Sequence, residues 1–128
     1  MRIPYLLLAV TLIGSAEWAQ AQTPPEKTKS EEALIQATEI RFWLDMYYTD
    51  CGQFPKTEAG LQALIEKPRS GCPNWGPDPY TYVIPRDPWG RSWIYSSDGK
   101  ALELHSLGAD GLVGGVGENA DISYTWPQ

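Results

Sequence analysis

Residues 30–50, SEEALIQATEIRFWLDMYYTD, decide the fold that this sequence can adopt. Apolar residues recur within this stretch at spacings of four, three, four and three: Ala33, Ala37, Ile40, Leu44 and Tyr47. This spacing places them on one face of an α-helix, with polar residues such as Gln36 on the other face. We expect Ser30 to cap the helix and Gly52 to follow its end, near Asp50. The stretch therefore predicts a long helix with one face in the core.

A short second helix and a small antiparallel sheet are predicted after the long helix. Thr57 is expected to cap the second helix, which ends at Pro68. Residues 92–95 and 101–105 alternate in polarity around Asp98-Gly99, a strong signal for a β-hairpin. The predicted class is α+β, and a glycine-rich loop follows the last clear strand.

The N-terminal residues 1–21 have the layout of a secretory signal peptide. Residues 6–13 form an apolar core, and Ala19-Gln20-Ala21 supplies small residues at the cleavage position. The apolar run is shorter than the roughly 20 residues that span a bilayer, although a retained anchor is the alternative. We expect an exported protein, periplasmic or secreted, with no stable membrane span after cleavage. A flexible leader over 22–29 and a globular domain over 30–128 would remain.

The sequence contains two cysteines, Cys51 and Cys72. Export would place them in an oxidising compartment, where disulfides persist. Only one intramolecular pairing is possible, and the spacing matches neither a CxxC motif nor a zinc site. We therefore expect a disulfide that stabilises the fold by about 3 kcal/mol in the chain-entropy model.

The chain is acidic, with a formal net charge of −6. Binding to nucleic acid requires Lys and Arg side chains that neutralise phosphates. An acidic chain is also repelled by anionic membrane surfaces. The charge therefore disfavours nucleic acid as a partner.

Residues 106–122, SLGADGLVGGVGENADI, combine five glycines with oxygen-bearing side chains, and no Lys or Arg follows Lys100. The side chains that offer oxygen atoms here are Asp110, Glu118, Asn119 and Asp121. Ca²⁺ takes six to eight oxygens, and glycines let backbone carbonyls turn inward. Composition alone fits a calcium loop and a solvated glycine loop equally well. The spacing of an EF-hand is absent.

Three patches stand in order along the chain: GQFPKTEAGLQALIEKP at 52–68, DPWG at 87–90, and the glycine-rich stretch at 106–122. Together they resemble the C-terminal domain of the major pseudopilin of bacterial type II secretion, and the resemblance covers about residues 33–123. That family assembles a short periplasmic pseudopilus that helps to move folded proteins across the outer membrane. The resemblance implies a role in protein–protein interaction, with other pseudopilins, type II secretion components or an exported protein.

The resemblance also implies that the final loop binds Ca²⁺. Asp110 and Asp121 match the carboxylate ligands of the family, and the backbone carbonyl of Leu107 matches a main-chain ligand. Glu118 and Asn119 fall where the length of the loop varies between members, and either could complete the site.

The N-terminus departs from the family pattern. Family members begin with a basic leader, a Gly at the cleavage site, then Phe and a Glu, followed by a long apolar helix that forms the filament core. This sequence lacks that motif. With its signal peptide removed, the chain would also lack the helix that packs in the filament.

An enzymatic function is not expected. The only histidine, His105, lies in a predicted strand, and neither a GxSxG nor an HExxH motif occurs. The aromatic residues leave a second interpretation open, in which the chain is a free-standing exported module that binds a protein or carbohydrate ligand.

Overall fold

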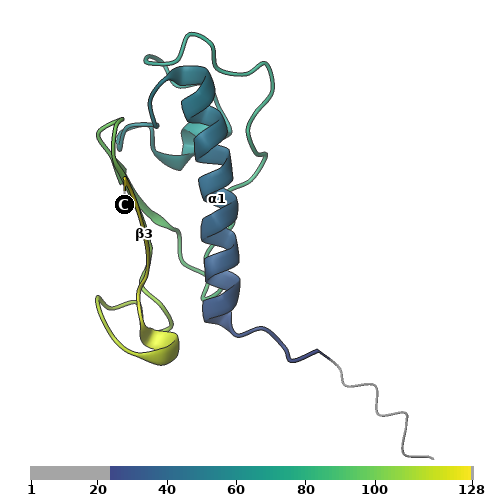
Figure 1. The fold of residues 1–128 in the computed structure, drawn as a ribbon, viewed down its shortest axis with the longest axis vertical. Helices are drawn as coiled ribbons and strands as arrows, with labels where there is room; N and C mark the ends of the chain where they lie inside the picture. The colour runs from purple at the N-terminus through teal and green to yellow at the C-terminus, as the bar shows by residue number, and fades with distance from the viewer. Residues whose placement is uncertain (1–23, 128) are drawn as a thin grey trace, which may run out of the picture.

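The computed structural model describes residues 24–127, so the predicted signal peptide lies outside the described residues. One long helix stands beside a three-stranded antiparallel sheet of order β1-β2-β3, as Figure 1 shows. The elements in chain order are α1 (Lys29–Cys51), η1 (Gly60–Leu64), β1 (Ile94–Ser97), β2 (Leu102–Ser106), η2 (Gly117–Asn119) and β3 (Ile122–Trp126). The predicted α+β class is confirmed. Between residues 24 and 127, no helix is long and apolar enough to cross a membrane.

Helix α1 begins earlier than the sequence predicted. Its N-cap is Thr28, whose hydroxyl accepts a hydrogen bond from the Glu31 amide at 3.2 Å. The Glu31 carboxylate in turn accepts a hydrogen bond from the Thr28 amide at 2.8 Å. This capping box needs an acid three residues after the cap, and Ser30 has Ala33 in that position. At the other end Gly52, with φ 71°, caps the helix after Cys51.

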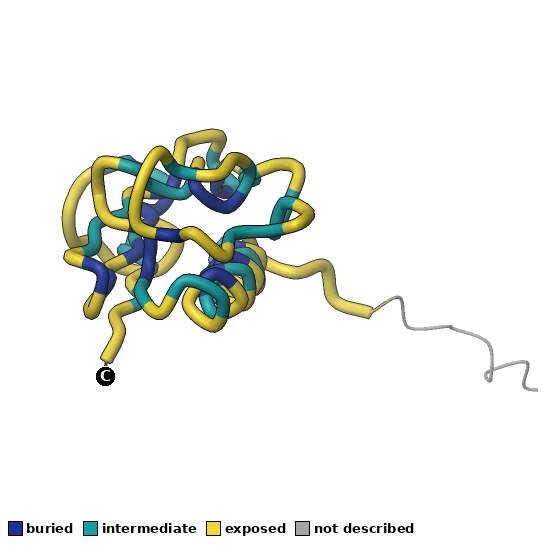
Figure 2. Tube along the Cα trace, turned by 90° about the horizontal axis from the view of Figure 1, so that it is seen from above, coloured by how far each residue is buried: buried dark blue, intermediate teal, exposed yellow. Residues whose placement is uncertain are grey.

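The predicted stripe of α1 is confirmed as the centre of the core. All five of its members are buried: Ala33, Ala37, Ile40, Leu44 and Tyr47. They pack with Phe54, Leu64, Leu102 and Leu104, which come from η1, β2 and the segment after α1. In Figure 2, seen from above, the buried segments lie mostly toward the inside of the molecule and the exposed segments toward its outside. Burying one Leu or Ile side chain fully contributes about 1.5–3 kcal/mol, so this stripe is what attaches the sheet to α1.

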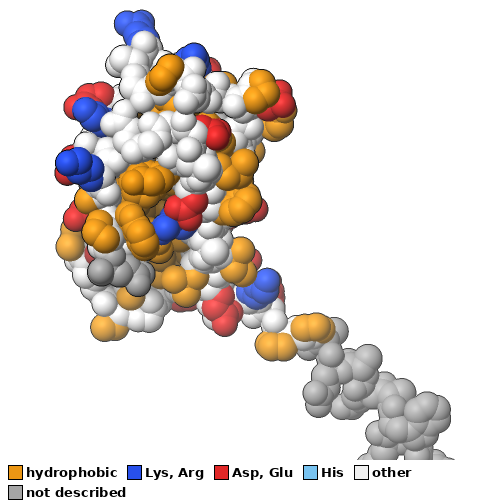
Figure 3. Space-filling view, turned by 45° about the horizontal axis from the view of Figure 1, so that its top comes forward, with side chains coloured by type: hydrophobic (Ala, Val, Ile, Leu, Met, Phe, Trp, Pro, Cys, Tyr) orange, Lys and Arg blue, Asp and Glu red, His pale blue; other side chains and the backbone are white. Residues whose placement is uncertain are grey.

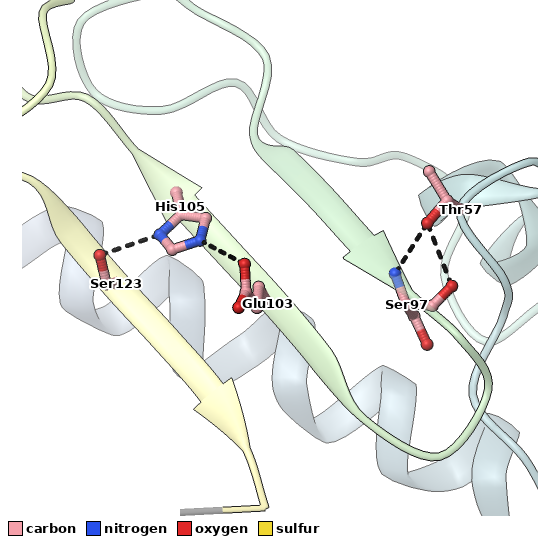
Figure 4. A network of polar contacts seen from close by, with 5 residues as sticks. All are labelled: Thr57, Ser97, Glu103, His105 and Ser123. Atoms are coloured by element: carbon pink, nitrogen blue, oxygen red, sulfur yellow. Dashed lines mark hydrogen bonds and ion pairs between the residues drawn. The ribbon is translucent and has the colours of Figure 1, made fainter.

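The second helix is only a short 3₁₀ turn, η1, and Thr57 does not cap it. The Thr57 hydroxyl instead donates to the Ser97 carbonyl at 3.0 Å and accepts from the Ser97 amide at 2.9 Å, as Figure 4 shows. The Thr57 amide also donates to the Ser97 carbonyl, at 3.0 Å. The Thr57 hydroxyl is therefore bonded to the end of β1 and does not cap a helix. Gly60, the first residue of η1, has φ 60°, which lies outside the range of a right-handed α-helix.

The predicted hairpin between β1 and β2 is confirmed. Ser97 pairs with Leu102, so residues 98–101 form the connection. One carboxylate oxygen of Asp98 accepts hydrogen bonds from the amides of Ala101 and Lys100, both at 2.8 Å. The bond from Ala101, which has the largest effect, and the bond from Lys100 lower the pKa of Asp98 below its ordinary value.

The third strand, β3, was not predicted. It pairs antiparallel with β2 over five residues, from Leu102↔Trp126 to Ser106↔Ile122. The glycine-rich loop therefore joins two neighbouring strands, where the sequence had placed it after the last strand. The alternation of Ile122, Tyr124 and Trp126 with hydroxyl side chains was the signal that could have revealed it.

The predicted disulfide between Cys51 and Cys72 is confirmed. It joins the last residue of α1 to the long segment that leads to β1. Close by, the Tyr80 hydroxyl donates to the Asp50 carboxylate at 2.8 Å, and burial raises the pKa of Tyr80 to about 12. The C-terminal end of α1 is therefore held by a covalent bond and a hydrogen bond.

Arg41 connects α1 to the edge strand β3. Its guanidinium lies 5.0 Å from the ring centre of Tyr124 and 4.5 Å from that of Trp126. Its Nε also donates to the Asp45 carboxylate at 2.7 Å, one helical turn along. The stacking spans two elements, whereas the ion pair lies within α1.

We expect Arg41→Ala to lower the free energy of unfolding by about 1–2 kcal/mol, because it removes two cation–π contacts and the packing of the arginine stem. Urea denaturation measures this loss. Asp45→Asn is the matched control and should cost below about 1 kcal/mol, as half-exposed ion pairs do. Equal losses in the two variants would show that the contribution of Arg41 comes from its ion pair within α1 and not from its stacking on β3.

Candidate metal-binding loop

The candidate site is the loop of residues 107–121, which connects β2 to β3. In Figure 1 it is the yellow-green loop at the end of the molecule where α1 begins. The Ser30 hydroxyl, in the first turn of α1, donates to the Glu118 carboxylate at 2.9 Å. The loop thus contacts the start of the helix as well as the two strands that carry it.

The base of the loop is closed by contacts between its first limb, residues 107–111, and its second limb, residues 118–121. The Ala109 amide donates to the Glu118 carbonyl at 2.8 Å. Gly108 has φ 67°, and a Cβ at this position would lie 2.7 Å from the Ala120 carbonyl oxygen. Only glycine fits here, because the two limbs approach so closely. These contacts bring residues 108 and 109 on one limb against residues 118–120 on the other.

Asp121 is the predicted ligand whose surroundings best fit a bound cation. One of its oxygens, Oδ2, accepts a hydrogen bond from the Gly114 amide at 2.9 Å. The other, Oδ1, is buried and has no hydrogen-bond partner among the described residues. A buried carboxylate oxygen without a partner is unfavourable, and a bound cation would satisfy it. Asp121 therefore fits the role of a calcium ligand.

The other predicted ligands are placed differently. Asp110 is exposed, and one of its oxygens accepts from the Leu112 amide at 3.0 Å. Glu118 is engaged with Ser30, so its carboxylate is directed at α1. Asn119 is exposed in η2, and Leu107 is half-buried at the start of the loop.

Acidic side chains alone do not form a metal cage in this loop. Among residues 24–127, no group of three or more His, Cys, Asp or Glu side chains is placed to hold a metal. An ion here would rely on carboxylates such as those of Asp110 and Asp121 together with backbone carbonyl oxygens. Ca²⁺ accepts such a mixed set of oxygen ligands.

A positively charged side chain contacts the loop, although the local sequence of the loop contains no Lys or Arg. Arg91, just before β1, donates from Nη1 to the Gly108 carbonyl at 2.6 Å and from Nη2 to the Ala109 carbonyl at 3.2 Å. The sequence of residues 106–122 does not reveal this contact, because Arg91 lies 17 residues before Gly108 and 18 before Ala109, and the fold brings them together.

Asp87 holds the turn from which Arg91 projects. The residue is only 4% exposed. Its Oδ1 accepts from the amides of Trp89, at 3.1 Å, and Arg91, at 2.8 Å. Its Oδ2 accepts from the Ser106 hydroxyl at 2.7 Å, at the end of β2. One carboxylate thus connects the DPWG turn to the residue that precedes the loop.

The structure also brings together three side chains that the sequence analysis did not connect. Figure 4 shows Ser123, His105 and Glu103 in a row across β3 and β2. His105 Nδ1 lies 2.9 Å from the Ser123 hydroxyl, and Nε2 lies 3.4 Å from the Glu103 carboxylate. In a serine-hydrolase triad the serine faces Nε2 and the acid faces Nδ1, which is the reverse of this arrangement. Two cavities lie beside η1, of about 580 and 390 Å³, and none of the three residues lines either of them.

Comparisons with known proteins agree with the resemblance seen in the sequence. The family model of the type II secretion system protein G matches residues 21–125. Type II secretion system core protein G of Pseudomonas aeruginosa is 35% identical, over 95% of this chain and 89% of that protein. Its counterpart in Vibrio cholerae is 38% identical, over 76% of this chain and 68% of that protein.

A solved structure agrees as well. The crystal structure of the major pseudopilin from the type 2 secretion system of enterohaemorrhagic Escherichia coli superposes with a TM-score of 0.62 at 30% identity. The match covers 74% of this chain and 84% of that chain.

Proposed function

Because this chain belongs to the protein G family of the type II secretion system, we propose that it acts in protein secretion by binding other proteins through a calcium-stabilised domain. The observation that carries the proposal is the family match over nearly all of the described fold. Its partners would be other pseudopilins, further components of the secretion system, or an exported protein.

The outer face of α1 supports a binding role. Leu34, Ile35, Phe42 and Met46 are between 41% and 62% exposed. At 100° per residue, Ile35, Phe42 and Met46 lie opposite the buried stripe, and Leu34 lies about a quarter-turn from it. Helix α1 therefore carries apolar side chains outside its buried face as well as on it. Apolar side chains also gather over the middle of the face seen in Figure 3. Exposed apolar patches are a common feature of protein–protein interfaces.

Calcium is proposed as a structural ion. Asp121, with its unpartnered buried oxygen, and Asp110 would supply carboxylates, and Leu107 would supply its backbone carbonyl. When bound, the ion would neutralise these carboxylates and hold the two limbs of the loop together. Asn119 is the better candidate for a further ligand, because the Glu118 carboxylate is hydrogen-bonded to Ser30.

A non-enzymatic role is part of the proposal. Ser123 and Glu103 are exposed residues of the sheet. Ser123 contacts His105 as an ordinary cross-strand pair between β3 and β2, and Glu103 contacts it from two residues away on the same strand, β2. Catalysis by acyl transfer needs a substrate cavity and oxyanion donors beside the nucleophile.

A free-standing exported binding module is the second candidate function. The cavity of about 580 Å³ beside η1 favours it, since ligand pockets have this size. Its lining combines apolar side chains, such as Phe54, with charged ones of both signs, such as Lys67 and Glu66. The two functions differ in what the protein captures in the periplasm.

Calcium should raise the thermal midpoint of unfolding, and a chelator should lower it. At a hundredfold excess over its Kd, a ligand of the native state raises the free energy of unfolding by about 2.7 kcal/mol. Asp110→Ala and Asp121→Ala should each remove the response, whereas Asp78→Ala, an exposed acid outside the loop, should keep it. A wild-type midpoint that neither calcium nor chelator moves would contradict the calcium proposal.

Substitution on the outer face of α1 should weaken partner capture without unfolding the domain. We expect Phe42→Ser, at 62% exposure, to reduce recovery of type II secretion components from periplasm by about tenfold, the loss typical of an interface aromatic. Tyr82→Ser, at 80% exposure and outside α1, is the control. Capture of a ligand without any secretion component would favour the binding module.

Export through a cleaved signal peptide is proposed for residues 1–21. The intact mass of the protein purified from periplasm tests it, and we expect a mature chain that begins at Gln22. A mass that includes the apolar run would instead support an uncleaved filament subunit.

A further inference from the structure

Arg91 is hydrogen-bonded to the first limb of the loop, at the two residues between two of the proposed ligands. Its guanidinium donates to the carbonyls of Gly108 and Ala109, at 2.6 and 3.2 Å. Those two residues are the ones that separate Leu107 from Asp110. The backbone between the main-chain ligand and the carboxylate ligand is therefore fixed by a side chain from outside the loop.

Gly111 shows how closely the limb is wrapped around this group. A Cβ on Gly111 would lie 2.7 Å from the guanidinium carbon of Arg91. Residues 108–111 thus curve over the guanidinium, with two carbonyls turned toward it. The Leu107 carbonyl and the Asp110 carboxylate, which flank these two carbonyls, have no hydrogen bond with Arg91.

The position of Arg91 is itself determined. Its amide donates to Asp87 Oδ1 at 2.8 Å, and its carbonyl accepts from the Asp87 amide at 2.8 Å. Asp87 also binds Ser106, the residue before Leu107. The same turn therefore holds the start of the limb through Ser106 and its middle through Arg91.

We propose that Arg91 is a positioning residue of the metal-binding loop, which sets Leu107 and Asp110 for the ion by holding the two carbonyls between them. This inference rests on the calcium site proposed above. It requires the planar fork of arginine, because two parallel N–H donors reach two successive carbonyls. A lysine at this position keeps the charge and loses the fork.

The test compares Arg91→Lys and Arg91→Met with the wild-type protein in two measurements. In chelator, amide hydrogen exchange of residues 107–118 should become about tenfold faster in both variants, because a charge-assisted hydrogen bond to the limb is lost. By titration calorimetry, the Kd for Ca²⁺ should rise by about tenfold in both variants, because the ligands are no longer held in place. Arg69→Met, an exposed arginine beside η1, is the control for loss of one positive charge.

The two variants separate positioning from simple charge repulsion. If Arg91 only repels the ion, Arg91→Met binds Ca²⁺ more tightly than wild type and Arg91→Lys binds like wild type, which overturns the proposal. Unchanged exchange of the loop amides in chelator also overturns it. If wild-type protein binds no Ca²⁺ and the loop amides still exchange faster in both variants, the calcium proposal fails while the hold of Arg91 on the loop stands.

Discussion

The buried carboxylate of Asp87 is the interaction on which the site depends. A carboxylate removed from water must be hydrogen-bonded, and Asp87 accepts from two turn amides and from Ser106. These bonds fasten the DPWG turn to the end of β2, which is where the glycine-rich loop starts. Two motifs that stand apart in the sequence are thereby one structural unit, and Arg91 is carried to the loop by that unit.

The parts of the fold that local sequence determines were predictable. The stripe of α1 has helical spacing and is buried as predicted, and the hairpin at Asp98 follows from its turn residues. The parts that depend on distant partners were not. Thr57 would cap a helix in isolation, but Ser97 takes its hydroxyl, and β3 forms because β2 offers an edge to an alternating segment.

The candidate site divides in the same way. Asp110 and Asp121 stand out from the sequence by their residue type and their setting among glycines, and the unpartnered oxygen of Asp121 agrees with that interpretation. The role of Glu118 could not be read from composition, since its contact is Ser30, 88 residues away. Arg91 was missed for the same reason, because a count of charges along the chain does not show which of them meet.

The disulfide has a mechanical consequence for α1. The helix is about 34 Å long at 1.5 Å per residue over its 23 residues, and its far end is bonded covalently to Cys72. A pulling force applied at Lys29 is carried along the helix to the covalent Cys51–Cys72 bond. The N-terminal end of the helix has no covalent bond of this kind, and it is held by the packing of Ala33 and by the hydrogen bond between Ser30 and Glu118. The two ends of α1 are thus attached differently, the C-terminal end by the disulfide and the N-terminal end by non-covalent contacts that include the loop.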